Sequence, residues 1–138
     1  MATAKQLPYD KDAEMAILGA LYIDPGLFGD INRLLTATDF YLPAHQEFYT
    51  AMGQCIMASG LDLVTLKAKL DERKSLERVG GIEYIVEMTN MVMDPACARR
   101  YIPIVKDCAV RRHMIEGYSK ALAGLYDRSK SVDAITEY

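Results

Sequence analysis

The residue types that could carry out catalysis or bind a metal are few in this sequence and lie far apart. The two histidines, His45 and His113, have no cysteine or acidic cluster around them at the spacing of a metal-ligand set. The same scarcity weighs against a Ser-His-Asp or Cys-His arrangement, although residues distant in sequence can still meet in a fold. The pattern therefore favours structural roles for both histidines.

A phosphate-binding loop requires a glycine-rich run that ends in Gly-Lys-Ser or Gly-Lys-Thr, and no such run occurs. The carboxylates of Glu83 and Glu87 are four residues apart, which is more typical of one solvated helix face than of an acid–base pair. We therefore expect no catalytic activity and no bound cofactor in this chain.

The three cysteines, Cys55, Cys97 and Cys108, are odd in number and show no Cys-x-x-Cys spacing. This pattern argues against a disulfide framework and against a zinc site. No apolar run approaches the roughly 20 residues that span a bilayer, and the first six residues lack the apolar core of a signal peptide. The sequence thus predicts reduced, packed cysteines, a cytoplasmic location and no membrane partner.

The chain has 138 residues, 51% of them hydrophobic and 25% charged, which is ordinary for one folded globular domain. Its net charge of −3 provides no overall positive field to attract nucleic acid. Direct DNA binding would need a local basic patch, for which the candidates are Arg99, Arg100, Arg111 and Arg112. The alternative is that these arginines lie on solvated turns of a helix.

The first two predicted helices are separated by Asp24-Pro25, because Asp can cap a helix and Pro supplies a preset first helical position. Asp10 and Asp12 favour the start of the first helix. The predicted apolar faces are Ala13, Ile17, Leu18 and Leu21 in the first helix, and Leu27, Phe28, Ile31, Leu34 and Leu35 in the second.

Three further helices are predicted to start at Pro43, at Asp62 and after Gly80-Gly81, with stops at Gly60 and at Asp94-Pro95. No period-two alternation and no Asn-Gly or Asp-Gly hairpin signal is found, so a sheet is not expected. The predicted buried faces of these three helices are, in order, Phe48, Tyr49, Met52, Cys55 and Ile56; Leu63, Leu66 and Leu70; and Ile82, Ile85, Val86 and Thr89.

A sixth, long helix is predicted from about residue 99 to about residue 127, interrupted only by Pro103, which could delay its start or kink it. Two rows at seven-residue spacing favour packing against one long helix of another subunit, and the alternative is a core helix within the monomer. Arg111 is the one polar interruption. The rows, which we predict as a subunit interface, are Tyr101, Cys108, Ile115 and Leu122, and Ile104, Arg111, Tyr118 and Leu125.

A polar turn at residues 127–131 precedes a seventh helix that begins with Val132-Asp133-Ala134-Ile135. So short a helix is not stable alone, so we expect a chain cut from a longer protein, in which the last two helices start an antiparallel hairpin. The predicted fold is all-α, with a compact multi-helix head and a long helix. The predicted parts of this one domain are a flexible tail at 1–8, a helical head at 9–95, and the long helix with its truncated hairpin at 96–138.

Five strings, in this order and at roughly this spacing, resemble the N-terminal domain of the DnaB-type replicative DNA helicase family. No single string is specific, but together they extend over about residues 8 to 138. They are Glu14-Met15-Ala16-Ile17-Leu18-Gly19-Ala20-Leu21, Asp39-Phe40-Tyr41 with Pro43-Ala44-His45, Asp62-Leu63-Val64-Thr65-Leu66, Val79-Gly80-Gly81-Ile82-Glu83-Tyr84-Ile85, and Tyr101-Ile102-Pro103-Ile104-Val105.

The resemblance implies a helical head and a hairpin that pairs between subunits, so that the domains form a collar on a hexameric ring. It also implies docking of primase, influence of a helicase loader, and action at the replication fork of a bacterium or phage. ATP and Mg would belong to a motor domain beyond residue 138, which would also make most of the DNA contacts. An alternative function is a module in which Arg99, Arg100, Arg111 and Arg112 guide single-stranded DNA.

Overall fold

The computed structural model describes residues 6–136, and every regular element within them is a helix. The all-α prediction is therefore confirmed. Residues 1–5 of the predicted tail and residues 137–138 of the predicted hairpin lie outside the described part. The helices are α1 (Lys11–Ile23), α2 (Phe28–Leu34), α3 (Pro43–Ala58), α4 (Leu63–Glu72), α5 (Gly81–Asn90), α6 (Ala98–Tyr126) and α7 (Val132–Ile135), with short 3-10 turns η1 (Pro25–Leu27), η2 (Ala37–Asp39) and η3 (Pro95–Cys97).

The helix boundaries follow the capping residues that the sequence offers. The Asp10 side chain accepts a hydrogen bond from the Ala13 backbone N–H at 3.0 Å, and Asp62 accepts one from Thr65 at 2.8 Å. Gly80 and Gly81 have φ angles of +94° and +72°, which are strained for any residue with a Cβ. The predicted starts of α1, α4 and α5 are thus confirmed, with a local physical cause for each.

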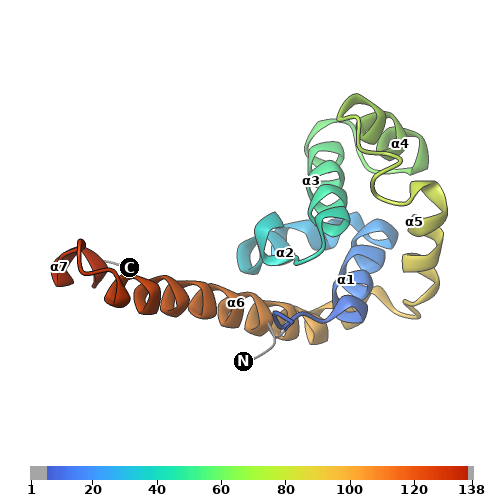
Figure 1. Ribbon diagram of the computed structural model, residues 1–138. Helices are drawn as coiled ribbons and strands as arrows, with labels where there is room; N and C mark the ends of the chain where they lie inside the picture. The colour runs from blue at the N-terminus through green and yellow to red at the C-terminus, as the bar shows by residue number, and fades with distance from the viewer. Residues whose placement is uncertain (1–5, 137–138) are drawn as a thin grey trace.

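Helix α1 lies at the centre of the head, where it packs against α3, α5 and the first half of α6 (Figure 1). Its residues Ile17, Leu18 and Leu21 are fully buried. A Cβ on Gly19 would lie 2.3 Å from the Met88 carbonyl oxygen, so only glycine allows α1 and α5 to approach this closely. The head core is therefore organised around α1.

Three residues predicted on buried faces are exposed instead. Leu34, Leu63 and Val86 are 56%, 42% and 50% exposed. Leu34 is the last residue of α2 and Leu63 the first of α4, and Val86 lies on the outward side of α5. An apolar stripe read from periodicity is wider than the surface that a neighbouring element covers, so the prediction of burial was wrong at these edges.

Helix α6 begins at Ala98, before Pro103, so a start delayed until after this proline is not observed. Its first part packs against the head and its second part extends away from it, as Figure 1 shows. Helix α7 turns back onto the end of α6, where the buried Ile135 packs against Gly124. The described residues thus include the start of the predicted hairpin.

Candidate assembly surface

A buried polar network inside the head holds α1, α3 and α5 together. The Glu14 carboxylate on α1 accepts a hydrogen bond from the Tyr41 backbone N–H at 2.9 Å and lies 2.7 Å from His45 Nδ1. His45 Nε2 lies 2.6 Å from the Tyr84 hydroxyl on α5. Glu14 and His45 are almost completely buried, so these bonds replace the hydration that both groups lose on folding.

Burial, assisted by the nearby carboxylates of Glu87 and Glu14, raises the pKa of Tyr84 to about 12, so its hydroxyl keeps its proton. That proton can be donated to His45 Nε2 while Nδ1–H donates to Glu14, and one neutral tautomer of His45 then satisfies every partner. His45 is thus a core residue whose two ring nitrogens are both bonded within the protein. Its carboxylate partner, Glu14, was not predicted from the sequence.

Arg112 joins the middle of α6 to two distant segments of the head. It is 8% exposed, and its guanidinium donates hydrogen bonds to the carbonyl oxygens of Pro8 at 2.8 Å and Asp39 at 2.7 Å. It also lies 5.2 Å from the centre of the Tyr41 ring, which stacks on Tyr9. This arginine therefore fixes the N-terminal segment and the η2 turn onto α6.

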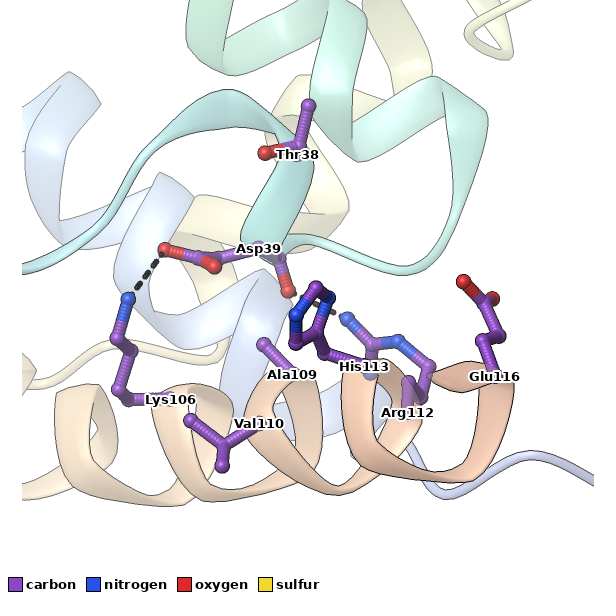
Figure 2. Close-up of a pocket in the computed structure, with 8 residues that line it drawn as sticks. All are labelled: Thr38, Asp39, Lys106, Ala109, Val110, Arg112, His113 and Glu116. Carbon is purple, nitrogen blue, oxygen red and sulfur yellow. Dashed lines mark hydrogen bonds and ion pairs between the residues drawn. The ribbon is translucent and has the colours of Figure 1, made fainter. Parts of the chain in front are cut away.

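Figure 2 shows the groove beside this junction, where η2 faces α6. It has a volume of about 420 Å³. The Lys106 ammonium group bridges it and pairs with the Asp39 carboxylate at 3.2 Å, while Glu116 lies at the other end and His113 between the two. The groove therefore lies where α6 leaves the head.

The predicted interface row changes its surroundings along α6. Tyr101 packs against the head core, and Cys108 is half-buried near Asp10 and Glu14, where burial raises the pKa of its thiol. Ile115 and Leu122 are 43% and 57% exposed. Tyr101 and Cys108 thus face the head of the same chain, as the core-helix alternative expected, whereas the later residues of the row have no head surface over them.

The second row is exposed along most of α6. Ile104, Tyr118 and Leu125 are 39%, 67% and 59% exposed, and the exposed Arg111 pairs with Asp107 of the preceding turn, at 2.7 Å. Beside this row a groove of about 360 Å³ is lined by His113, Met114, Gly117, Tyr118, Ala121, Ile135 and Thr136. The far half of α6 therefore carries exposed apolar side chains of both rows, beside a groove that α7 helps to form.

The four arginines predicted as possible DNA contacts do not form a patch. Arg112 is removed from that set because its guanidinium is buried and bonded to carbonyl groups. Arg99 pairs with Asp30 at 3.3 Å and Arg111 with Asp107, and Arg100 is exposed on the surface of α6. DNA guidance by the remaining three arginines stays a prediction.

A metal site and a membrane-spanning helix are both absent from residues 6–136. No group of three or more His, Cys, Asp or Glu side chains there is placed to hold a metal ion. No helix in the same part of the chain has the length and apolar character needed to cross a membrane.

A helical head with a long projecting helix defines an all-α domain. Residues 6–107 match the family model of the DnaB-like helicase N terminal domain, and the chain belongs to this family. It is 31% identical over 131 residues to the replicative DNA helicase DnaB of Geobacillus stearothermophilus, an alignment that covers 94% of this chain and 29% of that protein. It is 32% identical over 129 residues to the replicative DNA helicase DnaC of Bacillus subtilis, and that alignment covers 91% of this chain and 28% of the relative.

Solved structures agree with this assignment. The crystal structure of the N-terminal domain of DnaB helicase from Mycobacterium tuberculosis superposes with a TM-score of 0.88 at 32% identity, over 95% of this chain and 96% of that one. A DnaB-like replicative helicase, described with its interactions with primase, superposes with a TM-score of 0.74 at 21% identity. The superposition covers 86% of this chain and 28% of that one, and this likeness concerns the fold alone. The chain spans less than a third of the length of the curated helicases that it matches.

Proposed function

We propose that this chain is the non-motor collar domain of a hexameric replicative DNA helicase, where it assembles subunits and provides a docking platform for primase. The observation that carries the assembly role is the exposed apolar surface of α6 beyond Arg112, formed by Ile115, Tyr118, Leu122 and Leu125. Membership of the DnaB N-terminal family supplies the replicative context.

The pairing surface begins where the head ends. Residues 113–126 of α6 continue beyond the head, and among the described residues η2 lies beside only their first turn, at His113 and Glu116, while α7 packs on their far end. An isolated helix of this length is marginally stable in water, so burial of its apolar rows against a second copy would stabilise it. Arg111 lies at the rim of this surface, where its stem can pack while its charged group stays hydrated.

In this proposal the chain itself performs no chemistry. ATP hydrolysis, with its Mg ion, and most of the contact with DNA belong to a motor domain of the parent protein, which acts at the replication fork. Primase, and also a helicase loader, would bind to the collar that the paired heads form.

Light scattering of the 138-residue chain over a concentration series tests the assembly role. Substitution of Ile115→Asp together with Leu122→Asp is expected to shift any dimer or larger species toward monomer by at least about tenfold in Kd, because two charges would be buried in an apolar contact. Since the contact is apolar, added salt should weaken the association of the unmodified chain little.

The matched control is Met57→Asp with Val64→Asp, which places the same two charges on side chains of the head that are 80% and 78% exposed. This control should associate like the unmodified chain. Equal association of the two double variants would contradict the proposed surface. Primase binding is tested separately, by titration of the associated form.

A further inference from the structure

A further groove lies between the end of α2 and the first turns of α6. It has a volume of about 390 Å³ and is lined by Asp30, Arg33, Leu34, Arg99, Ile102 and Pro103. It shares no residue with the exposed apolar surface of α6 beyond Arg112. A role for this groove is therefore independent of the assembly proposed above.

The two guanidinium groups of this groove share a single carboxylate. Arg33 pairs with one oxygen of Asp30 and Arg99 with the other, so each arginine keeps most of its N–H donors unused by these pairs. Both arginine side chains are about three quarters exposed, at 76% and 75%. Exposed ion pairs of this kind contribute little to stability, so an incoming carboxylate could bind the spare donors at low cost.

The rest of the groove offers apolar surface. Leu34 is 56% exposed beside Ile102 and the exposed Pro103. The groove thus combines cationic donors with an apolar floor beside the first turns of α6.

We propose that this groove binds a short peptide segment of a partner protein in which a carboxylate neighbours an aliphatic side chain. The carboxylate would bind Arg33 and Arg99, aided by the positive end of the α6 dipole, and the aliphatic side chain would cover Leu34. No aromatic ring lines the groove, so it lacks the stacking surface on which single-stranded nucleic acid depends.

The test is a titration of the isotope-labelled 138-residue chain, followed by NMR, with an acetylated and amidated peptide Ala-Asp-Leu-Glu-Leu-Ala. Chemical-shift changes are expected at the backbone amides of residues 30–35, 99–102 and 104. The same peptide with Asn and Gln in place of Asp and Glu should bind with an affinity at least about tenfold lower, because it lacks the charge-assisted hydrogen bonds.

Removal of the groove cations in Arg33→Gln with Arg99→Gln should abolish these shifts. The matched control, Arg78→Gln with Arg128→Gln, removes two exposed arginines elsewhere and so has the same net charge as the groove variant. Its peptide binding should equal that of the unmodified chain. Leu34→Ser should weaken binding by about tenfold, through loss of the apolar contact.

Three results would overturn the proposal. The first is no shift of these amides at millimolar peptide, and the second is equal loss of binding in the two double-glutamine variants. The third is an oligothymidylate that shifts the same amides at lower concentrations than the peptide, which would assign the groove to single-stranded DNA.

Discussion

The two halves of α6 carry the same seven-residue row in different surroundings. Tyr101 and Cys108 of that row pack toward the head, whereas Ile115 and Leu122 remain exposed. The buried Arg112 lies between the two pairs and marks the point where the head ends. The difference teaches that an apolar row shows that a helix must be covered, but not whether its own chain or a second one covers it.

The two halves also differ in what supports them. The first half is fixed by apolar packing and by polar groups that all have partners, and no buried side-chain N or O atom among the described residues lacks a hydrogen bond. Among the described residues, the second half has η2 beside its first turn and the short α7 packed on its end. We therefore expect substitutions in the first region to change the free energy of unfolding, and comparable substitutions in the second to change mainly association.

The largest effect is expected from Glu14→Ala, compared with Glu116→Ala. Loss of the Glu14 carboxylate leaves the Tyr41 N–H and the His45 ring without their buried partner, at a cost of about 3–5 kcal/mol. Glu116 is exposed on the projecting half of α6, so its loss should change stability little. Urea unfolding followed by circular dichroism measures both.

Both variants should be measured in a chain that also carries Ile115→Asp and Leu122→Asp, so that self-association does not add to the apparent free energy of unfolding. If Glu14→Ala fails to fold, Glu14→Gln, which keeps the shape and one acceptor, provides a milder variant with an expected loss of about 1–2 kcal/mol. Equal stability of the Glu14 and Glu116 variants would contradict the role of the network.

The sequence predicts most of the fold because helix boundaries depend on local chemistry. Capping by Asp10 and Asp62 and the positive φ angles at Gly80 and Gly81 are determined within a few residues of each boundary. The Glu14–His45 pair joins residues 31 positions apart, and no local rule brings these together. One signal was available, since Glu14 precedes Ile17 and Leu18 by three and four residues and so shares their buried face.

The burial of Arg112 likewise depends on partners that are distant in sequence and that no local rule predicts. The sequence grouped it with Arg111 as an exposed basic pair, yet it continues the buried face of Val105 and Cys108 at helical spacing. A charged residue on such a face needs specific partners, and these are the carbonyl groups of Pro8 and Asp39, over 70 residues away in sequence. Only the tertiary structure shows them.

An intermediate effect is expected from Arg112→Met, compared with Arg111→Met. The first substitution removes two hydrogen bonds to carbonyl groups at the junction, and we expect a loss of about 2–3 kcal/mol in the free energy of unfolding. Arg111 makes only an exposed pair with Asp107, so its loss should leave the urea midpoint nearly unchanged. Similar shifts of the midpoint for both variants would show that Arg112 does not join the head to α6.

The smallest expected effect is on the local stability of the projecting half of α6, and it should differ between two glycines of that half. A Cβ on Gly117 would meet no atom within 4 Å, whereas a Cβ on Gly124 would lie 3.1 Å from the Ile135 side chain. Gly117→Ala should therefore stabilise this half by about 0.5–1 kcal/mol through helix propensity alone. In Gly124→Ala the same gain is offset by crowding against α7, so we expect no net increase in stability. Amide hydrogen exchange across residues 113–126 measures this local difference, and equal protection in the two variants would mean that α7 does not pack on α6 through Gly124.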